Sequence, residues 1–390
     1  GDVPYTPFVL AFAVLDKDAK LTIYTDRRKL TPSVEAALEP GIAILARGEF
    51  EAALAVLGKA QLRVRADSAG ASESILAALK ASGAKLSTAE DPCALPKACK
   101  NETELAGTRH AHQLDGAALC RFLAWLDRET VGAALTEMGA SDRLEAFRRE
   151  CGDVQGLSFP TISGAGANGA IVHYRVTKES DKVLEPGSLY LVDSGAQYPG
   201  GTTDVTRTVA IGTPTAEMIE MFTRVLKGHI ALASAIFPDG TTDSQLDALA
   251  RTPLWRAGLD YDHGTGHGVG SFLGVHEGPH RISKMPSRVA MKPGMVVSNE
   301  PGFYRTGAFG IRIENLLYVR QHSEITGAKA FYGFDVLTLA PIDLNLVDAE
   351  MLDKGEVEWL NCYHQRVAET LSPKVDPDTR KWLKSAARAI

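Results

Sequence analysis

Residues 1–97 alternate short apolar runs with short amphipathic ones, and two different periods separate the strands from the helices. Alternating apolar and β-branched residues predict strands, whereas apolar residues three and four positions apart predict helices. The predicted strands are residues 8–15, 21–25, 42–46 and 62–66, and the predicted helices are residues 49–59 and 72–81. The turn-rich run Asp91-Pro-Cys-Ala-Leu-Pro then predicts the end of a small α/β domain, for which we take residues 1–97.

The pattern changes in residues 98–390, which predict a larger α+β domain. Its predicted helices are residues 102–131, 142–150, 217–236, 244–257 and 348–367, the fourth with Thr242 or Asp243 as N-cap. Strands and glycine-rich turns are expected from residue 153 onward and again over residues 264–319. Residues 164–169 match the dinucleotide-binding pattern G-x-G-x-x-G, but we predict a strand and not a helix at residues 170–176, which excludes that interpretation.

Composition narrows the classes of function. The 390 residues are 45 % hydrophobic and 23 % charged, as in globular proteins with two domains. The net charge of −6 without a basic block excludes a nucleic-acid partner, and no apolar run approaches the roughly 20 residues that span a membrane. Five cysteines without a C-x-x-C pair argue against a disulfide framework or a thiolate zinc site, so we expect a cytoplasmic protein.

Four carboxylates and one imidazole lie on strand-like or glycine-flanked segments of the second domain. Asp193 and Asp204 belong to two runs joined by Gln-Tyr-Pro-Gly-Gly, which predicts an antiparallel hairpin that aims both carboxylates at one point. Glu300 and Glu314 end two further runs with the same predicted geometry. His267 lies between glycines, which permit a close approach of the backbone.

These five side chains predict a metal centre. A single carboxylate near a strand end is usually a turn or cap residue, but several in buried-strand contexts would each cost several kcal/mol if left without a partner. Two divalent cations would neutralise them, with His267 as the fifth ligand. Oxygen-rich ligands with one imidazole suit Mn²⁺, Co²⁺ or Zn²⁺, and a pair of such ions is an established arrangement for peptide hydrolysis.

Several motifs in the second domain resemble those of a known family. They are Val192-Asp-Ser-Gly-Ala, Gly201-Thr-Thr-Asp-Val-Thr-Arg, His263-Gly-Thr-Gly-His-Gly-Val-Gly, Asn299-Glu-Pro-Gly and Gly310-Ile-Arg-Ile-Glu-Asn. They are similar to those of the pita-bread metallopeptidases, which include methionine aminopeptidase, prolidase, aminopeptidase P and the metal-free creatinase. The nine-residue interval from His267 to His276 most resembles the long, three-domain cytosolic form of aminopeptidase P.

The resemblance implies a creatinase-like α/β domain followed by a pita-bread domain with a curved antiparallel sheet. It also implies roles for the residues: Asp193 chelates one metal ion, Asp204 and Glu314 bridge two ions, and His267 and Glu300 complete the second. Glu300 is then the general base. His173 and His276 would contact the substrate and the tetrahedral intermediate, and His263 and Arg312 would line the proline side of the cleft.

The same resemblance implies release of the first residue from peptides with proline in the second position. We also expect a homodimer and, of the three metals that suit the ligands, Mn²⁺. Other interpretations stay open: the three histidines could be structural, and Arg312 could orient a carboxylate ligand. For the whole chain the alternatives are a prolidase restricted to Xaa-Pro dipeptides and a non-catalytic peptide-binding module. Family members of the long form carry a further α/β domain before the one that begins here.

Overall fold

The computed structural model describes residues 2–130, 134–325 and 329–390, and the chain divides into the units Gly1–Pro96 and Lys97–Ile390. The elements of the first unit are β1 (Phe12–Leu15), β2 (Leu21–Thr25), α1 (Pro32–Ala37), β3 (Ala43–Ala46), α2 (Phe50–Lys59), β4 (Arg63–Ala66), α3 (Glu73–Ser82), β5 (Lys85–Thr88) and the start of α4 (Ala94–Ala98). β1 pairs with β2 antiparallel, whereas β2 with β3 and β4 with β5 are parallel. Tyr24, Phe50, Leu54 and Leu79 form the core of this unit.

Most predicted elements of the first unit agree with the structure to within one residue, but the first strand does not. β1 begins at Phe12 because residues 8–11 have no strand to pair with, and Phe8, Val9 and Leu10 are 40 %, 50 % and 44 % exposed. An apolar run becomes a strand only where a neighbouring strand satisfies its backbone groups. The sequence pattern also missed α1 and β5.

The helices of the second unit are α5 (Glu102–Glu129), α6 (Glu137–Glu150), α7 (Ala216–Ala233), α8 (Asp243–Trp255), α9 (Lys354–Leu371) and α10 (Pro377–Ala386). α6 begins five residues earlier than predicted because Thr136 caps it, accepting a hydrogen bond from Gly139 N at 3.2 Å. α9 begins at Lys354 because Asp353 is its cap, and α10 was not predicted. The predicted end of the first helix at Val131 lies outside the described residues. Among the described residues, no helix has both the length and the apolar character that crossing a bilayer requires.

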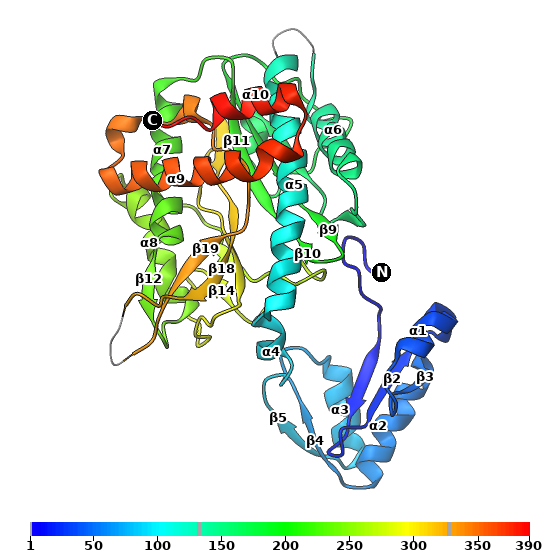
Figure 1. Cartoon of the computed structure of the whole chain (residues 1–390). Helices are drawn as coiled ribbons and strands as arrows, with labels where there is room; N and C mark the ends of the chain where they lie inside the picture. Colours follow the sequence, from blue (N-terminus) through cyan, green and yellow to red (C-terminus); the bar gives the residue numbers. More distant parts are fainter. Residues whose placement is uncertain (1, 131–133, 326–328) are drawn as a thin grey trace. The chain divides into compact units, whose positions relative to one another are not determined.

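Antiparallel pairing joins the strands of the second unit (Figure 1). One sheet has the order β11 (Val205–Ile211), β8 (Ser188–Ser194), β7 (Ile162–Ala165). A second has the order β12 (Ile236–Pro238), β19 (Phe331–Val336), β18 (Asn315–Gln321), β15 (Val296–Asn299). Three smaller sheets complete the described part of the unit. One has the order β10 (Gly201–Thr202), β9 (Ala196–Tyr198), β6 (Gly156–Leu157). The other two are strand pairs, β13 (Gly266–His267) with β14 (Arg281–Ile282) and β16 (Gly302–Arg305) with β17 (Phe309–Arg312).

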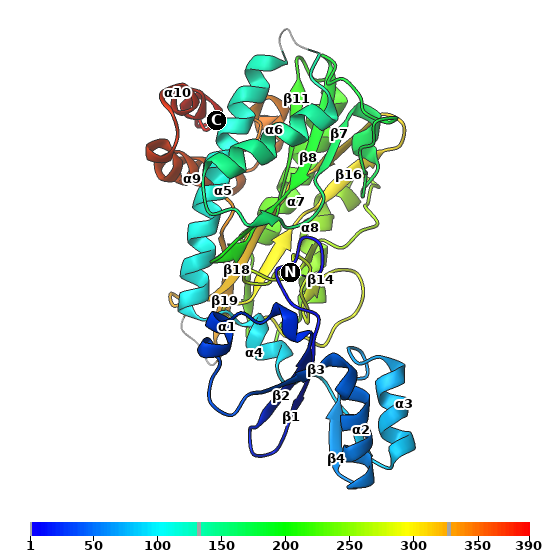
Figure 2. The ribbon, with the colours of Figure 1, turned by 90° about the vertical axis from the view of Figure 1, so that its right-hand side faces the viewer.

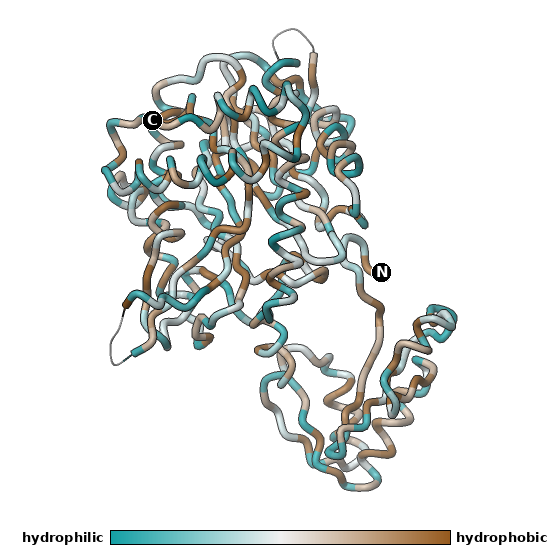
Figure 3. Tube along the Cα trace, viewed as in Figure 1, coloured by the Kyte–Doolittle hydropathy of each residue, from teal (hydrophilic) through white to brown (hydrophobic). Residues whose placement is uncertain are grey.

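Helices cover one face of each main sheet. α5 and α6 pack on β8 through a cluster that contains Phe122, Leu144, Tyr190 and Val192 (Figure 2). Because side chains alternate along a strand, Asp193 points to the opposite face from Val192. Burial of each large apolar side chain contributes about 1.5–3 kcal/mol, so this cluster fixes the direction in which Asp193 points. In Figure 3 the strands inside this unit are largely hydrophobic, whereas α9 and α10 alternate hydrophilic and hydrophobic segments.

The predicted strand at residues 170–176 is wrong. All seven residues are described, and they form the end of a 3₁₀ helix, η3 (Gly166–Ala170), followed by a turn. Ile171 N donates to Asn168 O at 3.1 Å and Tyr174 N donates to Ile171 O at 3.0 Å, so these backbone groups are satisfied locally. Of the apolar residues that suggested a strand, Tyr174 joins a buried cluster with Ile162 and Leu191, whereas Ile171 is 54 % exposed.

Candidate active site

Asp193 and Asp204 lie on neighbouring strands of the first sheet. Asp193 is in β8, directly opposite Thr206 of β11, and Asp204 immediately precedes β11. The pairing of β8 with β11 stops there and resumes beyond Asp204, where β9 pairs with β10. The predicted hairpin is therefore present, and Asp204 lies at an interruption in its ladder, where its side chain is free to turn towards the cavity.

Glu300 and Glu314 occupy an equivalent interruption in the second sheet. The pairing of β15 with β18 ends at Asn299 opposite Asn315, and the pairing of β16 with β17 begins at Gly302 opposite Arg312. The two glutamates thus lie across from each other between two ladders. Glu314 N donates to Thr206 O at 3.1 Å, which joins this interruption to β11, the strand that follows Asp204.

His267 reaches the carboxylates from β13. Its Nε2 atom lies 3.4 Å from Asp204 Oδ2 and 3.6 Å from Glu300 Oε1. Its Nδ1 atom lies 3.0 Å from Gly268 O, and because a carbonyl oxygen only accepts, Nδ1 carries a proton there and Nε2 is the ring nitrogen that faces the carboxylates. A Cβ on Gly266 would lie 1.9 Å from Ser298 O, so only glycine allows this approach.

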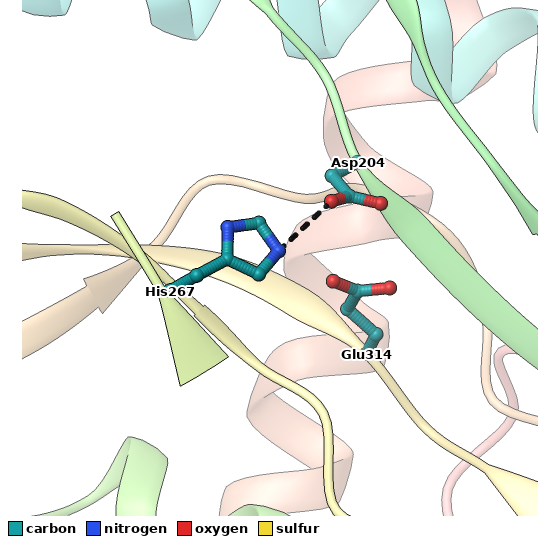
Figure 4. Close-up of side chains that lie close together, drawn as sticks. All are labelled: Asp204, His267 and Glu314. Atoms are coloured by element: carbon teal, nitrogen blue, oxygen red, sulfur yellow. Dashed lines mark ion pairs between the residues drawn. The ribbon is translucent and has the colours of Figure 1, made fainter. Parts of the chain in front are cut away.

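The structure brings the five predicted ligands into one cavity. Asp204, His267 and Glu314 offer ligand atoms that all lie within 4.8 Å of one another, and Figure 4 shows them pointing towards a common centre. Asp193 and Glu300 line the same cavity, whose volume is about 540 Å³. These five side chains come from segments spread over more than 100 residues, which makes their meeting a property of the fold.

The electrostatics of this cluster favour cations. Burial raises the pKa of Asp204 well above its ordinary value, and repulsion from Asp193 and Glu300 raises it further. Burial likewise raises the pKa of Glu314 well above the usual range, and repulsion from the negative charge of Asp204 is the next largest cause. Two buried oxygens, Asp193 Oδ1 and Glu314 Oε1, have no hydrogen-bond partner among the described residues. Crowded, desolvated carboxylates with unused lone pairs fit divalent metal ions of the oxygen-preferring kind.

Arg312 lines the cavity, but its hydrogen bonds go to protein groups. Its guanidinium donates to Asp193 Oδ2 at 2.7 Å, to Tyr304 OH at 2.7 Å and to Thr206 Oγ1 at 3.2 Å. The Tyr304 hydroxyl in turn lies 2.8 Å from His263 Nε2. Of the two roles expected for Arg312, these contacts favour the orientation of a carboxylate.

A buried hydrogen-bond chain lies behind the two glutamates. Arg207 Nη2 donates to Asn315 Oδ1 at 2.8 Å, which turns the amide nitrogen of Asn315 towards His229 Nε2 at 3.1 Å. His229 Nε2 is therefore an acceptor, and its Nδ1 donates to Asn299 O at 3.1 Å. Burial lowers the pKa of His229 to about 3, and the positive charge of Arg207 is the next largest cause, so the ring stays neutral. The chain ties together the residues that flank both glutamates.

The three remaining predicted histidines also line the cavity. The His276 ring lies 4.1 Å from that of His267, centroid to centroid, and burial lowers the pKa of His276 to about 4. Burial also lowers the pKa of His263 to about 3, so both rings are neutral at pH 7. His173 is exposed at the cavity wall.

Sequence reasoning missed Tyr304, Arg207 and His229. Arg207 stands at the end of one of the quoted motifs, but nothing in a sequence indicates that its partners lie more than 100 residues away. His229 lies within an apolar stripe of α7, a pattern that predicts only a residue of the hydrophobic core. A polar residue inside an apolar helical stripe is the signal that could have found it, because a buried polar group needs a partner.

The chain belongs to the metallopeptidase family M24, whose sequence profile matches residues 106–321. The C-terminal region of the same family matches residues 330–390, and a creatinase/prolidase N-terminal domain matches residues 1–104. The pita-bread fold predicted from the sequence is thereby confirmed, as is the α/β domain before it.

Individual relatives indicate which members of this family the chain is similar to. The whole chain is 39 % identical to aminopeptidase P1 of Lotus japonicus, of which it covers 69 %, and 42 % identical to a probable Xaa-Pro aminopeptidase P of Aspergillus niger, of which it covers 66 %. The crystal structure of an X-prolyl aminopeptidase from Caenorhabditis elegans, described as a cytosolic enzyme with a di-nuclear active site, superposes with a TM-score of 0.92 at 35 % identity. It matches all of this chain, which covers 65 % of it. The predicted resemblance to aminopeptidase P is confirmed, and the chain spans about two thirds of the length of these relatives.

Proposed function

We propose that this chain is a dinuclear metallo-aminopeptidase that releases the N-terminal residue from peptides with proline in the second position. The observation that carries the proposal is the meeting of four carboxylates and the His267 imidazole in a single cavity of the second unit. The kinship with Xaa-Pro aminopeptidases supplies the substrate class. In this proposal residues 98–390 form the catalytic domain and residues 1–97 a separate domain.

The metal ions would be held by Asp193, Asp204, His267, Glu300 and Glu314. Mn²⁺ is the proposed ion, with Zn²⁺ and Co²⁺ as alternatives, because four oxygen ligands and one nitrogen suit these ions better than thiolate-preferring ones. A pair of bound divalent ions would polarise the scissile carbonyl and lower the pKa of the attacking water. Arg312 would hold Asp193 in place through its hydrogen bond to Oδ2.

Side chains of the site would transfer the proton and bind the substrate. Glu300 would act as general base: it accepts a proton from the attacking water and passes it to the leaving proline nitrogen. Its Oε1 accepts a hydrogen bond from Ser298 Oγ at 3.1 Å, which orients the carboxylate. His173 and His276 would donate hydrogen bonds to the peptide and to the tetrahedral intermediate, and His263, tied to Tyr304, would border the proline ring.

Substrate length and the second residue test the proposal. Proline has a fixed φ and no backbone N–H. A site shaped for its ring therefore needs no hydrogen-bond acceptor at the position where any other residue would present an N–H. We expect hydrolysis of Xaa-Pro-Xaa tripeptides and longer peptides, with Xaa-Ala-Xaa peptides far slower. Measurement of kcat/KM on Xaa-Pro, Xaa-Pro-Xaa and Xaa-Ala-Xaa decides the matter. A preference for the dipeptide would favour a prolidase, and equal rates on the alanine and proline tripeptides would refute proline selectivity.

The roles of His173 and His276 can be separated from metal binding. Replacement of either by Ala is expected to lower kcat/KM sharply, because each would contact the substrate, and to leave the metal content unchanged. Elemental analysis of the purified variants beside steady-state kinetics measures both quantities. Loss of bound metal in either variant would show that the missing imidazole is a metal ligand.

We also propose a cytoplasmic homodimer. The five cysteines are all free, as expected in a reducing compartment, and the Caenorhabditis elegans relative is described as cytosolic. Light scattering of the purified protein tests the dimer, and a mass equal to one chain of 41.8 kDa would exclude it.

A further inference from the structure

Glu137 is a buried carboxylate that the proposed mechanism does not use. It is the first residue of α6 and is 0 % exposed. Among the described residues, no Lys, Arg or His forms an ion pair with it. The N-terminus of α6 favours a negative charge at this position, but a buried carboxylate also requires hydrogen-bond donors.

Those donors all come from one segment of the chain. Glu137 Oε1 accepts from Ala165 N at 2.6 Å and from Asn168 Nδ2 at 2.9 Å. Glu137 Oε2 accepts from Tyr174 OH at 2.8 Å, from Asn168 Nδ2 at 3.1 Å and from Lys182 N at 3.2 Å. The carboxylate thus gathers residues 165–182 around itself.

The turn that carries His173 lies between two of these donors. It begins at Asn168 and ends at Tyr174, and its backbone is closed by bonds from Ile171 N to Asn168 O and from Tyr174 N to Ile171 O. Both ends are therefore fastened to the Glu137 carboxylate, Asn168 through both of its oxygens and Tyr174 through Oε2. His173, the residue directly before Tyr174, is exposed towards the cavity.

The direction of each hydrogen bond in this cluster follows from its chemistry. Burial, with Glu137 as a further cause, raises the pKa of Tyr174 to about 12, so its hydroxyl keeps its proton at neutral pH. Asn168 Nδ2 donates to the Tyr174 oxygen at 2.8 Å, so the hydroxyl proton is shared among three acceptors: Glu137 Oε2 at 2.8 Å, Ser180 Oγ at 2.8 Å and Ser180 O at 3.1 Å. Every group around Glu137 is a donor, so only a side chain with two acceptor oxygens satisfies them all.

We propose that Glu137 is a positioning residue for His173: its two oxygens clamp both ends of the turn 168–174 and so set where the imidazole meets the substrate. The inference rests on the proposed function, because it assigns a purpose to the position of a residue of that site. The metal ligands are outside the clamp, so its loss should disturb the substrate and not the metal.

A double-mutant cycle on the full chain tests the clamp. Glu137→Gln places an NH₂ group against donors while keeping the size of the side chain, so we expect kcat/KM for an Xaa-Pro-Xaa peptide to fall on the order of 10- to 100-fold, as misplacement of a contact group by about 1 Å can do. In a His173→Ala background the same change should cost less than about twofold, because the residue it positions is gone. The Kd for Mn²⁺ should be the same in all four proteins.

A matched control lies on the same helix. Glu145→Gln removes a carboxylate that pairs with Arg149 at the surface, and it should change none of these quantities. The histidine ¹H–¹³C NMR spectrum gives a readout independent of turnover: the His173 resonance, identified by its absence in His173→Ala, should shift in Glu137→Gln and not in Glu145→Gln. If Glu137→Gln fails to fold, Tyr174→Phe, which removes one of the five hydrogen bonds to the Glu137 carboxylate, replaces it in the cycle.

Three results would overturn the clamp: equal losses in both backgrounds, weaker Mn²⁺ binding in Glu137→Gln, or an unmoved His173 resonance. Absence of Xaa-Pro hydrolysis by the unaltered protein would instead refute the proposed function. In that case the NMR comparison still decides whether Glu137 sets the position of His173.

Discussion

Removal of divalent metal is expected to abolish Xaa-Pro hydrolysis completely, and addition of Mn²⁺ or Co²⁺ is expected to restore it. The physical reason is the crowding of Asp193, Asp204, Glu300 and Glu314, which no described cation other than Arg312 offsets by direct contact. Chelation followed by dialysis, metal analysis by mass spectrometry and titration with each ion measures the effect. Full activity in protein shown to be free of metal would rule out the two-metal mechanism.

The same crowding predicts a stability change that needs no substrate. Burial and mutual repulsion raise the pKa values of Asp204, Glu300 and Glu314 in the folded state. Groups with a raised folded pKa favour the folded state at low pH and lose that contribution as the pH rises through the folded pKa. Metal-free protein should therefore lose thermal stability between weakly acidic and neutral pH, and Mn²⁺ should raise Tm most at the higher pH. A Tm that does not respond to Mn²⁺ at neutral pH would contradict this.

Glu300→Gln is expected to lower kcat by about 10²- to 10⁴-fold, the usual contribution of a positioned general base. The amide cannot accept the proton of the attacking water, although it keeps the size of the side chain. Steady-state kinetics with saturating Mn²⁺ measures the loss. Near-normal turnover would show that another group is the base.

Two comparisons separate this effect from loss of metal. Asp204→Asn should chiefly empty the metal site, because Asp204 lies within reach of both His267 and Glu314, so its defect should appear in metal content. Glu220→Gln, which removes a surface carboxylate paired with Arg224 on α7, is the control and should leave kcat unchanged.

Local pattern determined much of the fold. In the first unit, β2 matches its predicted bounds, and α2 and α3 begin within one residue of prediction. In the second, Thr242, one of the two expected residues, occupies the N-cap position of α8, and its backbone N donates to Gln245 Oε1 at 2.8 Å. Hairpins are present at both predicted places, β8 with β11 and β16 with β17, because each joins two strands that follow one another closely along the chain.

The residues of the candidate site could also be predicted from the sequence, because their types are unusual in the segments where they occur. Carboxylates that end apolar runs, and a histidine among glycines, demand a partner whatever the fold. All nine residues singled out for this site line one cavity. Their chemistry could be predicted; which of their atoms face one another could not.

Tertiary structure alone decided the contacts that hold the site in shape. Arg312 was ambiguous until its bonds to Asp193 and Tyr304 were visible. Residues 170–176 look like a strand, yet none of the described strands pairs with them, and Glu137, a typical first residue of a helix, closes the turn there. The physical reason is that a pattern along the chain reports which groups must be buried or paired, whereas the partner of each group is set by packing between segments distant in sequence.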